Sequence, residues 1–147
     1  MKTIIFRFIS FFMLLSCNNS DDSFSPQNIT PILIGKNSIS NPSTPLQNSL
    51  ITNQAQWDIL LSTMNSVNNV SNNFTESSID FNNFDIVAVF RNPISNSSST
   101  VDITSIVETE NQRVVTVQNL IDGVSADVAQ PFHIVKIPKS TKPIVFQ

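Results

Sequence analysis

The chain has 147 residues, eight of them basic and eleven acidic, which gives a formal net charge of −3 at pH 7. This length is typical of a single domain, and the acidic balance argues against a nucleic-acid partner, because nucleic-acid-binding surfaces neutralise phosphates with basic residues. The one cysteine, Cys17, and the one histidine, His133, are too few for a zinc site built from several Cys or His ligands.

The first sixteen residues have the three parts of a secretion signal in the required order. Lys2 and Arg7 supply positive charge, the residues up to Leu15 are mostly apolar, and Ser16 is a small residue at the cleavage point. The apolar stretch of about a dozen residues is too short to cross a bilayer as a permanent helix. We therefore predict that residues 1–16 are a signal peptide.

Residues 14–17, with the sequence Leu-Leu-Ser-Cys, resemble the lipobox of bacterial lipoproteins. The resemblance implies that the chain is cleaved before Cys17 and that a diacylglycerol is attached to the thiol of this residue. A lone cysteine in an exported chain fits such a use, because it cannot form a disulfide within the chain. Since each buried methylene contributes ~0.8 kcal/mol, two or three acyl chains make a nearly permanent anchor.

The residues after the cysteine bear on where the anchor is displayed. Residues 18–24, Asn-Asn-Ser-Asp-Asp-Ser-Phe, resemble the acidic export signal of surface lipoproteins in Bacteroidetes. The alternative is a solvated acidic linker that no receptor recognises. On the first interpretation we expect a lipid-anchored protein of the outer membrane or cell surface.

Residues 17–30 are rich in Ser, Asn and Asp and hold little apolar surface, so we expect them to form a flexible tether. A single domain then covers residues 31–147. We expect a short strand at residues 32–34, and the prolines at positions 42 and 45 predict a loop over residues 35–48.

The clearest helix in the sequence begins after Asn53. This residue is a good N-cap, and Gln56 occupies the capping-box position three residues later. Apolar residues then recur at helical spacing on one face, which predicts packing against the core rather than a binding face. They are Trp57, Leu60, Leu61 and Met64. We expect the helix to end at residues 65–66 and the polar residues 68–78 to form a surface loop.

The apolar run at residues 86–90 predicts a central strand that is covered on both faces. Ile86, Val87 and Val89 are therefore candidate core residues. The alternating pattern at residues 101–107 predicts the next strand along the chain.

Residues 113–117 predict its hairpin partner, after a turn at residues 110–111. Two more strands are expected at residues 132–137 and 143–146, after a break at Asp122-Gly123. Together the elements predict an α+β fold, in which a mostly antiparallel β-sheet carries one packed amphipathic helix.

The order of elements is similar to the C-terminal domain of the PrcB family. The similar features are Leu-Ile-Thr at residues 50–52 before a helix with Trp57, Ile-Asp-Phe at residues 79–81 before the apolar strand, and the segment 131–137 near the end. They cover about residues 49–147. The family is named for a lipoprotein subunit of a bacterial surface protease complex, so the resemblance implies a secreted protease as a partner.

One segment departs from the family pattern. The family usually carries a Gly-Gly-Tyr-type turn after the central strand, whereas residues 92–100 contain neither Gly nor Tyr. A partner contact made by that turn in the family cannot be carried over to this chain, because a shared fold does not imply a shared function.

Catalytic and cofactor chemistry find little support in the sequence. A Ser-His-Asp hydrolase needs a histidine to accept the proton, and His133 lies within a predicted strand. No Gly-x-Ser-x-Gly elbow exists, and both glycines stand alone, which argues against a phosphate-binding loop. We therefore predict no enzyme activity, no catalytic residues and no cofactor.

Calcium is the metal that the sequence leaves most open. Its oxygen-bearing candidates are Asp80, Asn82, Asn83 and Asp85, which fall within six residues. The loop glycine and the distal bidentate Glu of an EF-hand are missing, so we interpret this segment as a capped turn without a metal.

Three functional hypotheses follow. The first is a surface-tethered, non-enzymatic domain that binds or stabilises another protein, with a sheet edge or the segment 92–100 as the contact. The second is a lipoprotein that binds a glycan or another ligand; against it, the single tryptophan lies on the buried helix stripe and tyrosine is absent. The third is a hydrolase built on Asp80 and Asp85.

Overall fold

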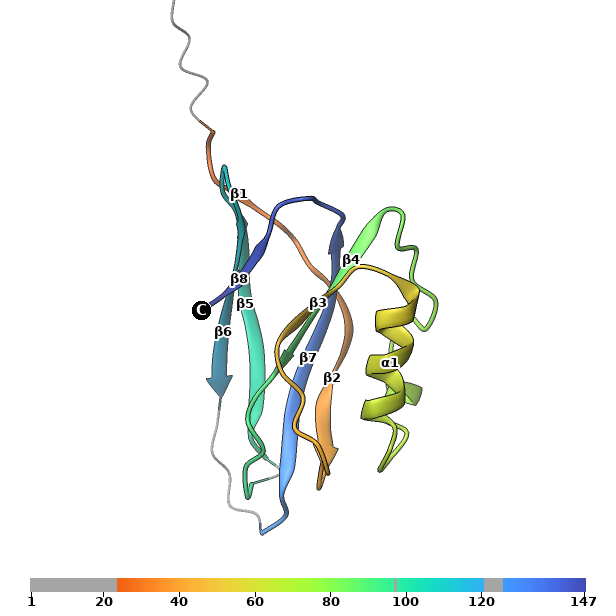
Figure 1. Ribbon diagram of the computed structural model, residues 1–147. Helices are drawn as coiled ribbons and strands as arrows, with labels where there is room; N and C mark the ends of the chain where they lie inside the picture. Colours follow the sequence, from red (N-terminus) through yellow and green to blue (C-terminus); the bar gives the residue numbers. More distant parts are fainter. Residues whose placement is uncertain (1–23, 97, 121–125) are drawn as a thin grey trace, which may run out of the picture.

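A computed structural model describes residues 24–96, 98–120 and 126–147. Their strands are β1 (Gln27–Asn28), β2 (Ile32–Ser40), β3 (Ser49–Ile51), β4 (Phe84–Phe90), β5 (Thr100–Glu108), β6 (Arg113–Leu120), β7 (Ala129–Pro138) and β8 (Ile144–Phe146). The helix α1 (Gln54–Met64) and the 3-10 helix η1 (Val70–Asn73) lie between β3 and β4 (Figure 1). The predicted signal peptide, Cys17 and the predicted break at Asp122-Gly123 lie outside the described residues.

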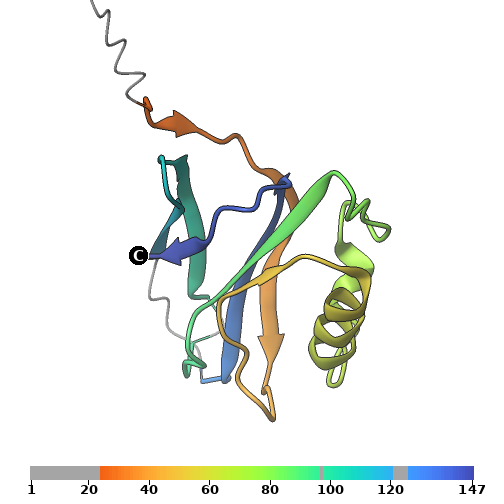
Figure 2. The same cartoon turned by 45° about the horizontal axis from the view of Figure 1, so that its top comes forward.

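The described strands form two four-stranded sheets. The outer sheet has the order β1-β5-β6-β8, and the central sheet has the order β2-β7-β4-β3. All pairs are antiparallel except β6 with β8. The central sheet lies between α1 on one face and the outer sheet on the other (Figure 2). The α+β class, with mostly antiparallel strands and one packed helix, is confirmed; the strands divide into two sheets.

The central sheet is covered on both faces, as the apolar run at residues 86–90 predicts. Ile86 and Ala88 face α1, whereas Val87 and Val89 face the outer sheet. The same alternation occurs in β7, because side chains along a strand point to opposite faces in turn. Two apolar cores therefore share one sheet.

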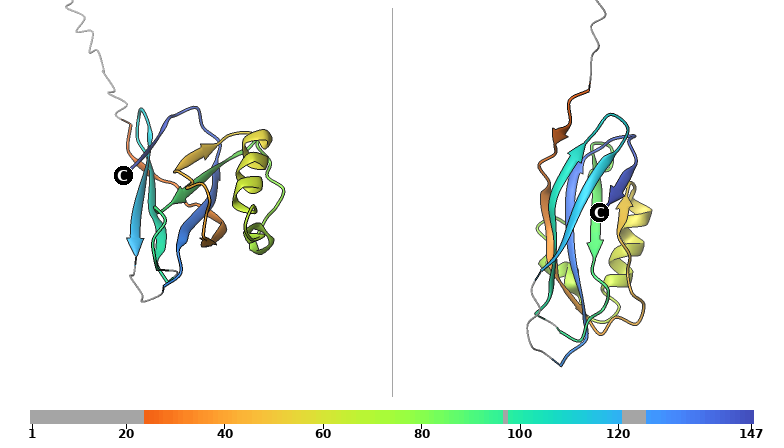
Figure 3. Two further views of the ribbon diagram at one scale, coloured as in Figure 1. Left: turned by 60° about the horizontal axis from the view of Figure 1, so that its bottom comes forward. Right: turned by 90° about the vertical axis from the view of Figure 1, so that its left-hand side faces the viewer.

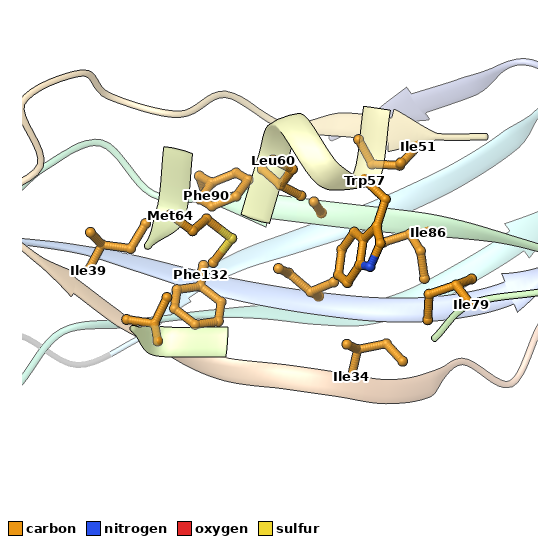
Figure 4. Close-up of a cluster of buried hydrophobic side chains, with 13 residues drawn as sticks. Ile34, Ile39, Ile51, Trp57, Leu60, Met64, Ile79, Ile86, Phe90 and Phe132 are labelled. Carbon is orange, nitrogen blue, oxygen red and sulfur yellow. The ribbon is translucent and has the colours of Figure 1, made fainter. Parts of the chain in front are cut away.

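Helix α1 begins as the sequence predicts. The side chain of Asn53 accepts a hydrogen bond from the backbone N–H of Gln56 (3.0 Å), and the side-chain oxygen of Gln56 accepts one from the backbone N–H of Thr52 (2.9 Å). The buried residues Trp57, Leu60 and Met64 confirm the core stripe (Figure 4). Leu61 packs half-buried against it.

Two predictions near the N-terminus are wrong. Residues 35–40 do not belong to a loop but continue β2, which pairs with β7 as far as Ser40 and has a register shift between Leu33 and Gly35. Gln27 and Asn28, assigned to the tether, form β1 on the edge of the outer sheet. Both segments are polar on their exposed side, so they become strands through pairing with a neighbour rather than through their own apolar pattern.

The segment 68–78 is also more than a surface loop. Val70 in η1 is buried, and the ring of Phe74 packs between Trp57 and Phe132, with ring centroids 6.0 Å away in each case. A Cβ atom placed on Gly35 would lie 2.5 Å from Cδ1 of Phe74. The absence of a side chain at Gly35 thus lets the aromatic ring lie directly against β2.

We expect Gly35→Ala to lower the free energy of unfolding by about 1–3 kcal/mol, because Phe74 cannot move away from a new methyl group without disturbing Trp57 and Phe132. In a Phe74→Leu background the same substitution should cost at least about 1 kcal/mol less, since the smaller side chain leaves room. Urea unfolding of the four variants of this cycle measures both quantities. Strictly additive costs would contradict the proposed clash.

Candidate functional site

The two sides of the sandwich differ in how the sheets are joined. On one side the chain crosses from β1 to β2 and polar side chains link the sheets. On the other side the sheets end in the three-residue strands β3 and β8, which lie on the same side of the molecule in the right panel of Figure 3. We call the second side, with Leu50, Ile144, Val145 and Phe146, the open side.

Strand β8 on the open side presents backbone groups that its own sheet does not use. The N–H of Arg113 donates to the carbonyl of Pro143 (2.8 Å), and the N–H of Gln147 donates to the carbonyl of Val115 (3.0 Å). Alternation along the strand then turns the backbone groups of Ile144 and Phe146 away from β6. Within the described part of the chain β8 has no second strand neighbour, and no backbone hydrogen bond outside the sheets reaches Ile144 or Phe146.

Apolar side chains accompany these backbone groups. Leu50, Ile144 and Phe146 pack half-buried against the core between the sheets, and Val145 is 40% exposed on the outer face. The core is therefore incompletely covered at this side. Unpaired strand groups beside apolar side chains are the usual setting for addition of a further strand.

The opposite side is closed by polar contacts. Lys36 of β2 pairs with Asp102 of β5. The outer edge of β2 is also capped, because the hydroxyl of Thr75 donates to the carbonyl of Leu33 (2.6 Å) and the N–H of Ser38 donates to the side chain of Asn37 (2.8 Å). Side chains therefore engage backbone groups of Leu33 and Ser38 on this side, which we call the closed side.

His133 lies at the closed side, between the sheets. Its Nδ1 accepts a hydrogen bond from the backbone N–H of Ile103 (3.0 Å) and stands 3.2 Å from Oδ1 of Asp102. Burial lowers the pKa of His133 below its ordinary value; Asp102 opposes this shift and Lys36 adds to it. The geometry describes a neutral imidazole that acts as a hydrogen-bond acceptor.

The segment 92–100, a predicted contact, is partly held by the domain. Ile94 exchanges two backbone hydrogen bonds of 2.9 Å with Ala129. Next to it, the fully buried side chain of Gln130 accepts from the N–H of Leu46 (3.0 Å) and donates to the carbonyls of Leu46 (2.8 Å) and Arg91 (3.0 Å). Gln130 thus joins the loops after β2 and β4 at the end away from β1 (Figure 1).

A hollow of about 300 Å³ lies between the β2–β3 loop and the end of α1. Its lining includes Ile39, Pro42 and Leu46 but no charged or aromatic side chain. The other lining residues all carry hydroxyl groups: Ser43, Thr44, Ser62, Thr63 and Ser66. Its small size and uncharged lining suit a small neutral ligand or a partner's side chain.

The carboxylates considered for calcium or hydrolysis are already engaged. Asp80 accepts from the N–H of Asn82 (3.0 Å) and the side-chain amide of Asn83 (2.7 Å), and the latter bond chiefly lowers the pKa of Asp80. Asp85 is buried, with Oδ1 3.6 Å from Nζ of Lys139 and Oδ2 3.3 Å from the N–H of Ser140. The ammonium group of Lys139 thus forms an ion pair with Asp85, while Oδ1 of Asp85 accepts no hydrogen bond within the described residues.

The sequence did not reveal the open side or the contact between His133 and Ile103. The short apolar segment at residues 143–146 predicted a strand, but not that the strand would lie on an edge. Within the described residues, no helix has the length and apolarity needed to cross a membrane.

No family model matches this chain, and neither a curated protein nor a solved structure matches it. The similarity to the PrcB family therefore stays a prediction.

Gln130→Leu should lower the free energy of unfolding by about 3 kcal/mol, because the backbone groups of Leu46 and Arg91 would lose buried partners. Gln118→Leu, at an exposed position of β6, is the matched control and should change stability by less than about 0.5 kcal/mol. Denaturant unfolding of both variants tests this. Equal effects would contradict the role of Gln130 in joining the loops.

Proposed function

We propose that this chain is a lipid-anchored protein of the bacterial outer membrane or cell surface, and that it binds another protein without catalysing a reaction. The observation that carries the binding proposal is the open side, where unpaired backbone groups of β8 adjoin half-buried apolar side chains. A β-strand of the partner would satisfy both features. A secreted protease is the first partner to test, as the resemblance to the PrcB family implies.

The anchor proposal rests on Cys17 and on the distance from it to the folded domain. The first contact of the described chain is made by Phe24, whose ring lies 4.1 Å from Nζ of Lys142. Lys142 in turn pairs with Glu108 (3.0 Å) and donates to the carbonyl of Thr109 (2.8 Å). The seven residues 17–23 span at most about 25 Å, so the domain would stay close to the lipid surface.

A short anchor changes how the open side would act. Strand addition over three residues supplies few hydrogen bonds, each with a net value of about 0.5–1.5 kcal/mol. A partner held at the same surface would meet the open side at a raised effective concentration, which increases occupancy without further contacts. The chain would thus hold a partner at the membrane through a modest interface.

Cys17→Ser should move the protein from the membrane fraction to the soluble fraction and abolish incorporation of labelled fatty acid, because the thiol that carries the lipid is gone. Fractionation of cells expressing the two forms measures this. A wild-type protein that carries no fatty acid and retains residues 1–16 would overturn the anchor proposal and leave the open side to be judged separately.

Val145→Lys should reduce recovery of the partner at least about tenfold in a crosslinked pull-down from intact cells, since a lysine on an edge strand opposes strand addition. Leu33→Lys is the matched control, because Leu33 is similarly exposed (46%, against 40% for Val145) on a strand of the closed side. Its recovery should match the wild type. Equal recovery with Val145→Lys, or no partner for the wild type, would contradict the proposal.

The uncharged hollow supports a second candidate, the binding of a glycan or another small neutral ligand. Its hydroxyl groups could exchange hydrogen bonds with a sugar, although no aromatic ring lines it for stacking. Titration with a panel of monosaccharides, followed by amide NMR, separates the two candidates. Changes in amide chemical shift confined to Ser43, Thr44 and Ser62 would favour glycan or ligand binding. No change at millimolar sugar would reject it.

A further inference from the structure

Three strands contribute charged or titratable groups to one point on the closed side. Lys36 of β2 stands directly opposite His133 of β7 in the antiparallel register. Asp102 of β5 pairs with Lys36 and lies 3.2 Å from Nδ1 of His133. These contacts connect the central sheet to the outer sheet.

The backbone of β5 explains why a side chain is needed here. Strand β1 pairs only with Val107 and Glu108, and the N–H of Ile29 then donates to the carbonyl of Ile106 (2.8 Å). Beyond that point the chain leaves for β2, and the β5–β6 register shifts between Ile103 and Ser105. The N–H of Ile103 has no strand neighbour as acceptor, and Nδ1 of His133 takes that place.

We infer that His133 is an acid-sensitive latch between the two sheets: the neutral imidazole holds the backbone amide of Ile103, and the imidazolium releases it. A proton taken from solvent would occupy the Nδ1 lone pair that now accepts the amide hydrogen. The imidazolium N–H would then donate to Asp102, which already pairs with Lys36. The amide of Ile103 would be left without an acceptor at the edge of β5.

Burial and the charged groups near His133 determine the pH range in which the latch opens. Burial disfavours the imidazolium most, Asp102 favours it, and Lys36 disfavours it, so the pKa of His133 lies below its ordinary value. The latch is therefore closed at neutral pH. Because the unfolded chain takes up the proton at higher pH than the folded chain, stability falls as pH drops below about 6.5 toward the folded pKa.

Release of the Ile103 amide would also affect a neighbouring hollow. A hollow of about 340 Å³ lies between the segment that crosses from β1 to β2, including Ile29 and Pro31, and residues 103–106 of β5. Loss of the hydrogen bond from Ile103 to His133 would release residues 103–106 of β5, which line this hollow, from the central sheet. It would also leave the amide of Ile103 unpaired beside the hollow. The inference depends on these contacts alone and does not require the proposed partner.

The test is hydrogen exchange of the Ile103 amide, measured by NMR on the full chain in detergent and corrected for the intrinsic pH dependence of exchange. Its protection should fall about tenfold as His133 titrates. His133→Asn is the matched variant, because its side-chain oxygen can accept the same hydrogen bond without titrating. The variant should keep its protection throughout. Constant protection in the wild type, or the same loss in His133→Asn, would overturn the latch.

Asp102→Asn provides a second test if His133→Asn does not fold. Removing the carboxylate takes away the charge that favours the imidazolium, so the loss of Ile103 protection should move to lower pH. Imidazole nitrogen shifts should also show Nδ1 unprotonated at neutral pH. A transition that stays in place or moves to higher pH, or an Nδ1–H tautomer at neutral pH, would refute the inference.

Discussion

Burial of the central sheet on both faces is the constraint on which the rest of the fold depends. In β4, Ile86 and Ala88 enter the core beneath α1, while Val87 and Val89 enter the core beneath the outer sheet. Each large aliphatic side chain buried in this way contributes roughly 1.5–3 kcal/mol. A one-residue slip of β4 would exchange the two sets. The register of β4 and β7 therefore fixes the positions of the helix, the outer sheet and the groups at their margins.

This constraint explains how much of the fold could be predicted from the sequence. Local sequence patterns predict the helix and the central strand. The helix is predicted by the Asn53 cap and the apolar stripe, and the strand by the unbroken apolar run at residues 86–90. No local pattern predicts the second half of β2, because its exposed Lys36, Asn37 and Ser38 acquire strand structure only from pairing with β7. The division into two sheets likewise depends on contacts between distant segments, which no local pattern encodes.

The candidate site follows the same rule. The prediction for Cys17 comes from the sequence alone, because the pattern of a signal peptide is local and linear. The contact of Lys36 with Asp102 joins residues 66 apart, and whether His133 faces the core or solvent depends on the β7 register. Likewise, residues 143–146 predict a strand, but only the sheet order makes β8 an edge.

The two sides of the sandwich differ in the groups that cover their sheet edges. On the closed side, backbone groups that could otherwise pair with a further strand are hydrogen-bonded to the side chains of Thr75, Asn37 and His133. On the open side the strands are short, which limits pairing, yet Leu50 and Phe146 remain half-buried and the outward groups of β8 lack protein partners in the described chain. Natural sheets often protect exposed edges by shortness alone. Here the protection is unequal: three segments supply such side chains on the closed side, whereas on the open side Asn48 accepts from the N–H of Phe90 (2.7 Å) beside β3 and no such bond reaches Ile144 or Phe146 in the described chain. At β8 an added strand would meet backbone groups that have no partner in the described chain, whereas at Leu33 and Ser38 it would compete with existing side-chain hydrogen bonds.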